Sequence, residues 1–353
     1  MMDTKERFSA PFFIQSKKAI NTLTKHQAFQ CDNPPKLHYA SMMSQAAPLQ
    51  TGIPQRSEPL CSEVFSHTAC TVYQTGSTGI NEDRLFASAP LYAVVDGASS
   101  LVDTLYNGRT GAEQAAQCIY KEFSAYYQDR VRNKKHLPLS QAAHSANSLL
   151  AEHMLSYGIN CKTADPKQRL RLWSASAAAV WINDSHAEWM QIGDSQIVFI
   201  KNGGSWYMPA KNADHDRQTM IHWKELSQQG ITDIRTALKS DIESVRLQMN
   251  RTFGVLNGEQ AMSSFLQTGA VPLNDIAHIL IFTDGLTMPC AEPRQGTDYT
   301  ALCDAYLRGG LSELHNTITQ IQASDPACTM YPRFKCHDDT AAIALSVSSE
   351  NKR

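Results

Sequence analysis

The chain has 353 residues, 42% of them hydrophobic and 19% charged, a composition typical of a soluble globular protein that can bury a sizeable core. Its formal net charge of −2 argues against nucleic acid or anionic lipid as a partner. No apolar run reaches the roughly 18 residues of a membrane span. The twelve histidines form no His-Glu-x-x-His motif and the nine cysteines no Cys-x-x-Cys pair, so the common zinc templates are absent.

Residues 1 to about 60 differ in composition from the rest of the chain. They hold six of the fifteen prolines, are rich in Gln, Ser and Asn, and show little hydrophobic periodicity. Such a segment predicts a flexible N-terminal extension, residues 1–60, rather than a second domain. It has no signal-peptide core, so we expect a cytoplasmic protein; the sequence is also compatible with a secreted effector that another signal exports. A monomer is the default expectation.

From about residue 62 the pattern becomes regular, and elements can be predicted in chain order. Strands are predicted over residues 64–74, 91–95, 172–182, 187–192, 196–201, 205–208, 261–267, 278–282 and 340–347. Helices are predicted over residues 109–127, 138–156, 298–307 and 311–322, with further helical parts in the polar stretch 212–258. Because strands come in runs with helices grouped between them, the pattern favours an α+β fold over a doubly wound parallel sheet.

Acidic residues recur next to the predicted core strands. They are Glu82, Asp83, Asp96, Asp194, Asp284, Asp338 and Asp339. Several ionised carboxylates buried at adjacent strand ends would repel one another, and divalent cations such as Mn²⁺ or Mg²⁺ remove that cost. A single Asp-Gly after a strand is usually only a turn. The order and spacing of the whole series are what predict a metal site.

These segments, in order, resemble the successive motifs of the protein phosphatase 2C family. The matching segments are Asn81-Glu82-Asp83, Val94-Val95-Asp96-Gly97, Thr110-Gly111-Ala112-Glu113, Ile192-Gly193-Asp194-Ser195, Arg251-Thr252-Phe253-Gly254, Phe282-Thr283-Asp284-Gly285-Leu286 and Asp338-Asp339-Thr340. The resemblance covers about residues 62–348 and is closer to the bacterial members. It implies one catalytic domain over residues 61–350, with a four-layer α-β-β-α sandwich around two central antiparallel sheets.

The resemblance also implies roles for these residues. Asp96 would bridge two Mn²⁺ or Mg²⁺ ions with help from the Gly97 carbonyl. Asp284 and Asp338 would complete the ligand set of one ion, and Glu82 would hold the other ion directly or through water. Asp83 would orient neighbouring groups, and Asp194 resembles the ligand of a third, weaker ion in some members. The implied catalytic residues are Asp96, Asp284 and Asp338.

The chain departs from the family pattern at the expected substrate site. Thr78 stands where the family usually carries an arginine that clamps the substrate phosphate. Arg84 or Arg109 could take over that contact, or the loop Gly76-Ser77-Thr78-Gly79 could cradle an anion, but ordinary surface arginines and a flexible loop are the plainer interpretations. Thr78 and Arg84 are therefore the predicted substrate-binding positions.

Other departures concern proton transfer and the third ion. Ala98-Ser99-Ser100 follow the first Asp-Gly, where many eukaryotic members have a histidine, and neither His67 nor His215 can be placed from sequence. Met288 replaces a further metal-binding aspartate of some members, and Asp339 stands where many have asparagine, so a third ion is expected to bind poorly. Residues 205–260 contain the variable segment beside the cleft, where substrate contact and ordinary packing are both open interpretations.

Three functions follow from these observations. The first is hydrolysis of phosphoserine or phosphothreonine on signalling proteins by metal-activated water, without a phosphoenzyme. The sequence argues against a cysteine phosphatase, because no cysteine is followed by an arginine six residues later. The second is a pseudophosphatase that binds phosphoproteins with little turnover, which Thr78 favours. The third is a two-metal hydrolase of a nucleotide or another phosphoester.

Overall fold

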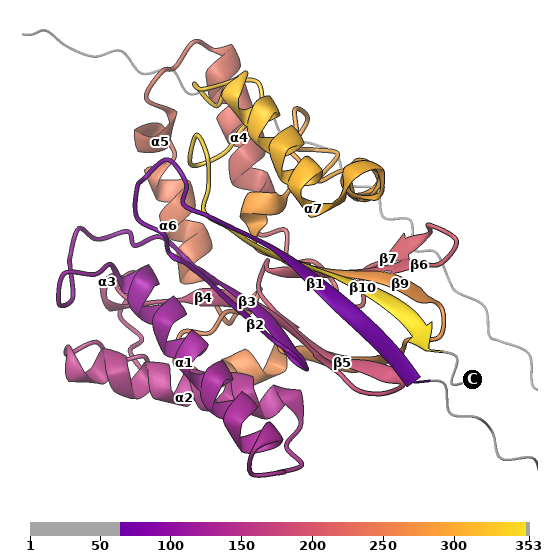
Figure 1. Ribbon diagram of the computed structural model, residues 1–353. Helices are drawn as coiled ribbons and strands as arrows, with labels where there is room; N and C mark the ends of the chain where they lie inside the picture. Colours follow the sequence, from indigo (N-terminus) through magenta and orange to yellow (C-terminus); the bar gives the residue numbers. More distant parts are fainter. Residues whose placement is uncertain (1–63, 351–353) are drawn as a thin grey trace, which may run out of the picture. The chain divides into compact units, whose positions relative to one another are not determined.

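The computed structural model describes residues 64–350, and the predicted extension over residues 1–60 lies outside them. Two antiparallel sheets stack face to face within this range, and helices cover their outer faces (Figure 1). This is the α-β-β-α sandwich that the motifs imply, and the α+β prediction is confirmed. No helix within residues 64–350 combines the length and the hydropathy that a bilayer crossing requires.

Each sheet has five strands, with the strands named here in spatial order. The β1 sheet consists of β1 (Val64–Gln74), β10 (Thr340–Glu350), β9 (Ile276–Phe282), β6 (Gln196–Lys201) and β7 (Trp206–Tyr207). The β2 sheet consists of β2 (Asp83–Ser88), β3 (Leu91–Gly97), β4 (Ala175–Ile182), β5 (His186–Ile192) and β8 (Gln267–Pro272).

Helices are grouped by the sheet that they cover or the cleft that they border. Helices α1 (Gly111–Val131) and α2 (Leu139–Ser156) pack on the β2 sheet, and α7 (Tyr299–Ala323) packs on the β1 sheet (Figure 1). The shorter helices are α3 (Pro166–Arg169), α4 (Arg217–Gln228), α5 (Ile234–Ala237) and α6 (Lys239–Leu247). Two 3₁₀ turns, η1 (Gln260–Ser264) and η2 (Asp284–Leu286), complete the described elements.

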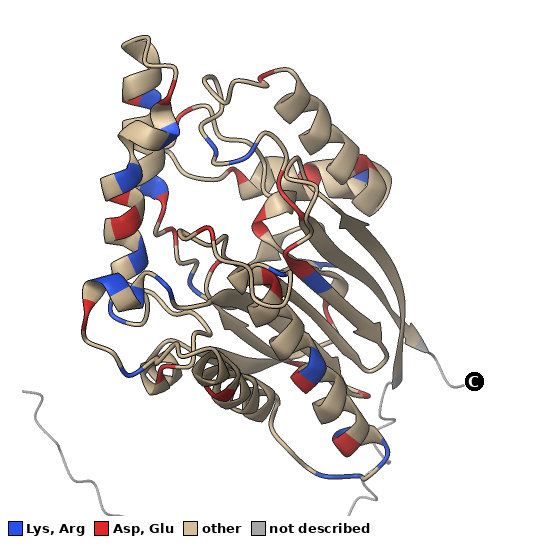
Figure 2. Cartoon of the chain, turned by 90° about the vertical axis from the view of Figure 1, so that its left-hand side faces the viewer, with Lys and Arg blue, Asp and Glu red and all other residues tan. Residues whose placement is uncertain are grey.

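The protein has three layers of hydrophobic core, one between the sheets and one between each sheet and its helices, because successive side chains of a strand point to opposite faces. In β3, Ala93 and Val95 face the core beneath α1 and α2, whereas Tyr92 and Val94 face the space between the sheets. In β9, Leu280 packs in the third core, against α7. Because alternate side chains of a strand point to opposite faces, both sheets are buried on both sides. Figure 2 shows the consequence: charged residues of both signs are spread over helices and loops, and the strands carry few.

Most predicted elements are present, and the exceptions have local causes. The strand predicted over residues 261–267 is wrong: residues 260–264 form η1, and β8 begins only at Gln267. Asp83 is the first residue of β2, a strand that the sequence analysis did not predict. The two helices predicted over residues 298–307 and 311–322 are the halves of α7, which breaks at Gly310, where φ is 75°.

The register of the strands brings the acidic residues to one end of the sandwich. Asp83 pairs with Asp96 across β2 and β3. In the β1 sheet, Gln196 at the start of β6 lies opposite Phe282 at the end of β9. Antiparallel neighbours begin where their partners end, so chain segments far apart in sequence deliver carboxylates to the same edge.

Candidate functional site

The carboxylates that end the core strands face a common space. A cavity of about 130 Å³ is lined by Asp96, Asp194, Asp284 and Asp338, together with Gly97. Asp96 lies near the end of β3, Asp284 opens η2 just after β9, and Asp338 lies just before β10. The structure therefore brings these predicted metal-binding residues together from segments that are far apart in the sequence.

The glycines that follow two of these aspartates are required by close backbone packing. A Cβ atom at Gly97 would lie 2.5 Å from the carbonyl oxygen of Ala112 in the first turn of α1. A Cβ atom at Gly285 would meet the Asp339 carbonyl oxygen at 2.0 Å. Real Cβ atoms do not approach other atoms so closely, so each Asp-Gly lets a strand end pack against a neighbouring segment. This packing fixes the position of both aspartates.

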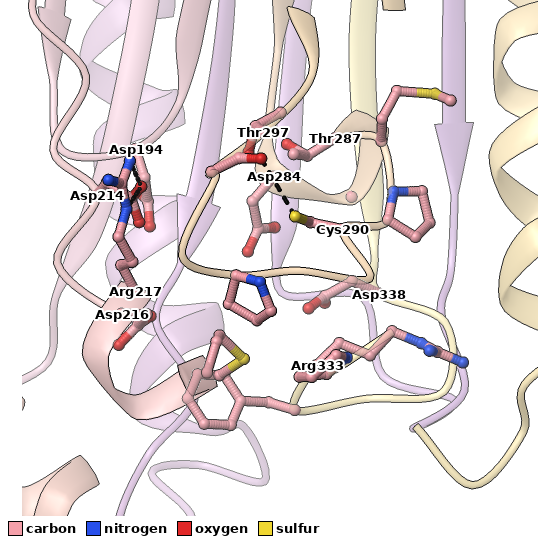
Figure 3. A pocket seen from close by; sticks show the side chains of 18 of the residues that line it. Asp194, Asp214, Asp216, Arg217, Asp284, Thr287, Cys290, Thr297, Arg333 and Asp338 are labelled. Atoms are coloured by element: carbon pink, nitrogen blue, oxygen red, sulfur yellow. Dashed lines mark hydrogen bonds and ion pairs between the residues drawn. The ribbon is translucent and has the colours of Figure 1, made fainter. Parts of the chain in front are cut away.

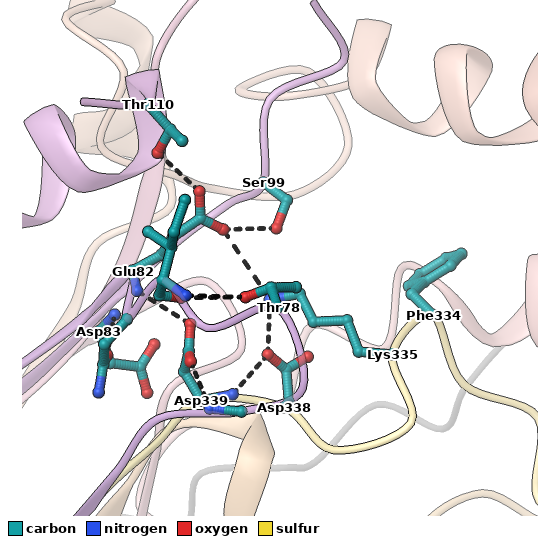
Figure 4. Close-up of polar contacts among 12 residues, drawn as sticks. Thr78, Glu82, Asp83, Ser99, Thr110, Phe334, Lys335, Asp338 and Asp339 are labelled. Carbon is teal, nitrogen blue, oxygen red and sulfur yellow. Dashed lines mark hydrogen bonds and ion pairs between the residues drawn. The ribbon is translucent and has the colours of Figure 1, made fainter. Parts of the chain in front are cut away.

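Glu82 does not line this cavity, and two hydroxyl groups hold its carboxylate (Figure 4). Ser99 Oγ donates to Glu82 Oε2 at 2.6 Å, and Thr110 Oγ1 donates to Glu82 Oε1 at 2.7 Å. Thr110 also caps α1, because its Oγ1 accepts a hydrogen bond from Glu113 N at 3.1 Å in a capping box. The start of α1 thus positions the Glu82 carboxylate.

Two further carboxylates lie behind the cavity and tie the strand ends together. Asp83 is 2% exposed and accepts a hydrogen bond from Thr283 Oγ1 at 2.7 Å. Asp339 accepts from the backbone N–H groups of Gly76 at 2.8 Å and Glu82 at 2.9 Å. Neither residue lines the 130 Å³ cavity. Their contacts suit a role in orienting the motif around Glu82.

Burial and mutual repulsion make this cluster electrostatically costly. Burial raises the pKa of Asp96 well above its ordinary value, and the negative charges of Asp83 and Asp194 raise it further. The pKa of Asp284 is raised in the same way, by burial first and then by Asp96 and Asp338. Such shifts favour the protonated acids unless positive charge is supplied, which is the condition that a cation site fulfils.

One lysine supplies part of that charge, and the sequence did not predict it. Lys335 Nζ donates to Asp338 Oδ1 at 2.6 Å and lies 3.9 Å from Glu82 Oε2, with its side chain only 12% exposed (Figure 4). Burial alone would lower the pKa of Lys335, but attraction to Asp338 raises it above the ordinary value. Lys335 is therefore an ammonium ion inside the carboxylate cluster.

A second cavity, of about 230 Å³, adjoins the first and shares several of its residues. Asp194, Asp284 and Asp338 line both, and in Figure 3 the side chains of Asp284 and Asp338 project into the same space. His215 also lines both cavities. Its Nε2 lies 3.7 Å from Asp194 Oδ2, and its ring stacks on Phe253 with 3.9 Å between centroids. The charged run Asp214-His215-Asp216-Arg217 therefore borders the cleft.

The donor set fits hard divalent cations. Its acidic members outnumber the two buried cations that face them, Lys335 and Arg246, and carboxylate oxygen is the ligand that Mg²⁺ and Mn²⁺ prefer. Among residues 64–350, no three His, Cys, Asp or Glu side chains converge closely enough to form a ready metal-binding group. The carboxylates instead line a shared space in which ions and water would complete the ligand sets.

The predicted substrate-binding positions lie elsewhere. Thr78 is exposed, and its hydroxyl donates to the Ile80 carbonyl at 3.1 Å. Arg84 donates to Gln117 Oε1 at 3.1 Å and to the carbonyl oxygens of Asn81 and Asp83 at 2.9 and 2.6 Å. Neither residue lines the two cavities described here. The geometry gives the predicted phosphate contact by Thr78 or Arg84 no support.

Two other residues that the sequence singled out are also placed. Arg109 is exposed and lies outside both cavities. His67 Nε2 lies 2.8 Å from the Tyr92 hydroxyl, a contact between β1 and β3 that belongs to the packing of the two sheets. Of the histidines considered, only His215 reaches the cleft.

A sequence model of protein phosphatase 2C matches residues 77–322, more than half of the chain. The chain therefore belongs to the protein phosphatase 2C family, and it is an enzyme of the class of metal-dependent protein serine/threonine phosphatases. No curated protein matches it in the sequence comparison.

Several solved structures of serine or serine/threonine phosphatases resemble the chain. A bacterial serine phosphatase bearing an arginine-to-lysine mutation has a TM-score of 0.50 and 14% identity, over 82% of this chain and 100% of that chain. The catalytic domain of PstP in complex with two manganese ions has a TM-score of 0.49 and 16% identity, over 81% and 99%. Stp1 from Staphylococcus aureus has a TM-score of 0.47 and 14% identity, over 84% and 100%. At these identities the likeness concerns the fold alone.

Proposed function

We propose that this protein hydrolyses phosphoserine or phosphothreonine on proteins at the carboxylate-lined cavity, with two divalent cations as cofactors. The observation that carries the proposal is the convergence of Asp96, Asp284 and Asp338 on one cavity of about 130 Å³. Burial raises the pKa of two of them, Asp96 and Asp284. Carboxylates gathered around one cavity repel one another unless cations are bound, and the family membership supplies the reaction class.

Mn²⁺ or Mg²⁺, when bound, would supply Lewis-acid polarisation of the phosphoryl group and a water molecule of lowered pKa. Asp96 and the Gly97 carbonyl would hold both ions, and Asp284 and Asp338 would complete the ligands of one of them; all four residues line the cavity. Glu82 keeps its carboxylate between the Ser99 and Thr110 hydroxyls, which suits a contact with the other ion through water. Asp83 orients the strand ends through Thr283.

A third ion has a weaker site here. Asp194 lies in the cleft, but the residue beside the second Asp-Gly is Met288, which cannot ligate a hard cation and lines the wider cavity. His215 Nε2, 3.7 Å from Asp194 Oδ2, lies beside the one carboxylate that this ion would use. We therefore propose two ions in the working enzyme.

The substrate side of the proposal rests on the adjoining space. The wider cavity, of about 230 Å³, opens beside the carboxylates and is lined by both apolar and charged side chains, among them Met220 and Arg217. A phosphorylated residue could enter the carboxylate cavity while its flanking peptide lies along this wider one. Cytoplasmic signalling, a monomeric state and the role of residues 1–60 as an extension stay predictions.

The test is phosphate release from an aryl phosphate and from a phosphothreonine peptide in the presence of Mn²⁺. We expect wild-type activity that chelator abolishes, and a loss of at least about a hundredfold in Asp96→Asn and Asp284→Asn, because each removes a metal-facing charge. Asp275→Asn, which changes a surface carboxylate paired with Lys201, is the matched control. Hydrolysis that survives in both cavity variants would overturn the proposal.

A pseudophosphatase is the second candidate, and Thr78 favours it because the usual phosphate-clamping arginine is missing. This candidate predicts that the folded wild-type protein binds Mn²⁺ and phosphopeptide yet releases no phosphate above the level of Asp96→Asn. Release by the wild type well above that level rules it out.

A further inference from the structure

An arginine that no sequence motif indicated faces the carboxylate cavity without a carboxylate partner. Arg246 lies near the end of α6, and its Nη1 donates to Ser174 Oγ at 3.1 Å. Its Nη2 donates to the Ser99 carbonyl at 3.1 Å. None of the ion pairs among residues 64–350 includes Arg246. Its two acceptors are neutral, so its charge is uncompensated at short range.

The same arginine is fixed where a bound anion would lie. Arg246 lines the 130 Å³ cavity together with Asp96, Asp284 and Asp338. Ser99 holds it from one side through its backbone and holds Glu82 through its hydroxyl, so one residue positions both the cation and the carboxylate. A guanidinium has five N–H donors, and the contacts to Ser99 and Ser174 leave others free to bind an oxyanion in a fork geometry.

Electrostatics make an anion the expected partner once cations balance the acids. Burial lowers the pKa of Arg246, and attraction to Asp216 and Asp194 partly offsets that effect. An arginine stays charged in proteins, so it carries a desolvation cost that an anionic ligand would relieve. With the carboxylates neutralised by cofactor ions, the guanidinium is the positive group that remains at this wall of the cavity.

The other cations near the cavity are already engaged or exposed. Lys335 Nζ is bonded to Asp338 at 2.6 Å. Arg235 is exposed on α5 and donates to the Phe334 carbonyl at 3.1 Å. Arg84 donates hydrogen bonds to Gln117 and to backbone carbonyls, and it lies outside the cavity. Among the described residues that line this cavity, Arg246 is the cation that takes part in no ion pair and is not exposed.

We propose that Arg246 binds the phosphate group of the substrate, and so supplies from α6 the contact that Thr78 cannot make. The inference rests on the proposed function, because it assigns a substrate-binding residue to the same cavity. It predicts that phosphate affinity depends on a residue in the variable segment 205–260, far along the chain from the first motif, Asn81-Glu82-Asp83.

The test measures inorganic phosphate binding to the Mn²⁺-loaded full chain by calorimetry, for wild type, Arg246→Met and Arg246→Lys. The loss of a charge-assisted contact predicts about tenfold to a hundredfold weaker phosphate binding in Arg246→Met and a smaller loss in Arg246→Lys. KM for an aryl phosphate should rise in parallel. Arg251→Met, which removes the same charge from an exposed position outside both cavities, is the matched control and should match wild type.

Manganese affinity and melting temperature, measured on the same proteins, separate a phosphate contact from a structural role. The inference fails if Arg246→Met binds phosphate within about twofold of wild type, or if its loss of phosphate affinity is matched by a loss of Mn²⁺ affinity. If wild type binds phosphate through Arg246 but releases none from any substrate, the hydrolytic proposal fails and this inference stands. If wild type hydrolyses substrate and Arg246→Met binds phosphate as tightly as wild type, the hydrolytic proposal stands and this inference fails.

Discussion

Lys335 gives the metal-free protein an internal cation at the place where the acidic motifs meet. Its ammonium is bonded to Asp338 at 2.6 Å and lies 3.9 Å from Glu82. A lone ammonium balances one charge, whereas several carboxylates surround it, so it lowers the cost of the cluster without removing it. A divalent ion that binds Asp338 must compete with Lys335 for the same oxygen atom.

Lys335→Met should therefore destabilise the metal-free protein and increase the stabilisation that Mn²⁺ binding provides. Removing one partner of this partly buried pair predicts a loss of about 1–3 kcal/mol in the free energy of unfolding in chelator. The melting-temperature gain at saturating Mn²⁺ should be larger than in wild type. Thermal unfolding with and without Mn²⁺ checks both, with Lys239→Met at an exposed helical position as the control. Equal Mn²⁺ responses in wild type and Lys335→Met would show that the lysine does not compete.

At the residue scale, the acidic residues of the cavity could be predicted from the sequence, whereas its lysine and arginine could not. Asp96 and Asp284 carry a local signature, because each ends an apolar strand and precedes a glycine. Lys335 and Arg246 carry none: they lie in a loop and on a polar helix, where periodicity gives no indication of what a side chain faces. Only the tertiary fold brings them to the cavity, so the replacement for the missing arginine could not be predicted.

The segment between α7 and β10 is the element that carries Lys335 and Asp338, and one buried carboxylate organises it. Asp325 accepts from the backbone N–H groups of Thr329, Met330 and Tyr331 at 2.9–3.1 Å and from Arg333 Nη1 at 3.0 Å. Burial alone would raise the pKa of Asp325, but these backbone and Arg333 hydrogen bonds lower it to about 2. The segment is thus a fixed support for its two cleft residues.

Asp325→Asn should lower the free energy of unfolding by about 1–2 kcal/mol near neutral pH. Because the folded-state pKa lies below the unfolded value, this stability is present above about pH 4 and is lost as the pH falls toward 2. Urea unfolding at several pH values checks the sign. A difference between wild type and variant that stays constant from pH 6 to pH 3 would contradict this account.

At the element scale, strands were predicted correctly where both faces are buried or where apolar and polar residues alternate strictly. Residues 196–201 were predicted as a strand and form β6 without change of bounds. The strand prediction for residues 261–267 was wrong, because the apolar residues Met262 and Leu266 pack against the core from a 3₁₀ turn and the loop after it. A short apolar run does not by itself distinguish these conformations.

For the whole molecule, the raised pKa values of Asp96 and Asp284 predict how stability depends on pH and metal. The folded, metal-free protein binds these protons more tightly than the unfolded chain, so these groups lower stability as the pH rises above about 4. Bound cations require the deprotonated acids and reverse the trend. The melting-temperature gain from Mn²⁺ should therefore grow from pH 5.5 to pH 8, and Asp96→Asn should flatten this dependence. A gain that shrinks with pH in wild type contradicts the assignment.

The central claim is that the strand-end carboxylates form a two-ion site, and the number of ions bound tests it most directly. Calorimetric titration of the full, metal-free chain with Mn²⁺ should give two ions per wild-type chain. Asp96→Asn should lose at least one of them and bind the other more weakly, because Asp96 lines the cavity and is the residue proposed to hold both ions. Binding of no ion by folded wild type, or two ions bound equally well by Asp96→Asn, would contradict the account.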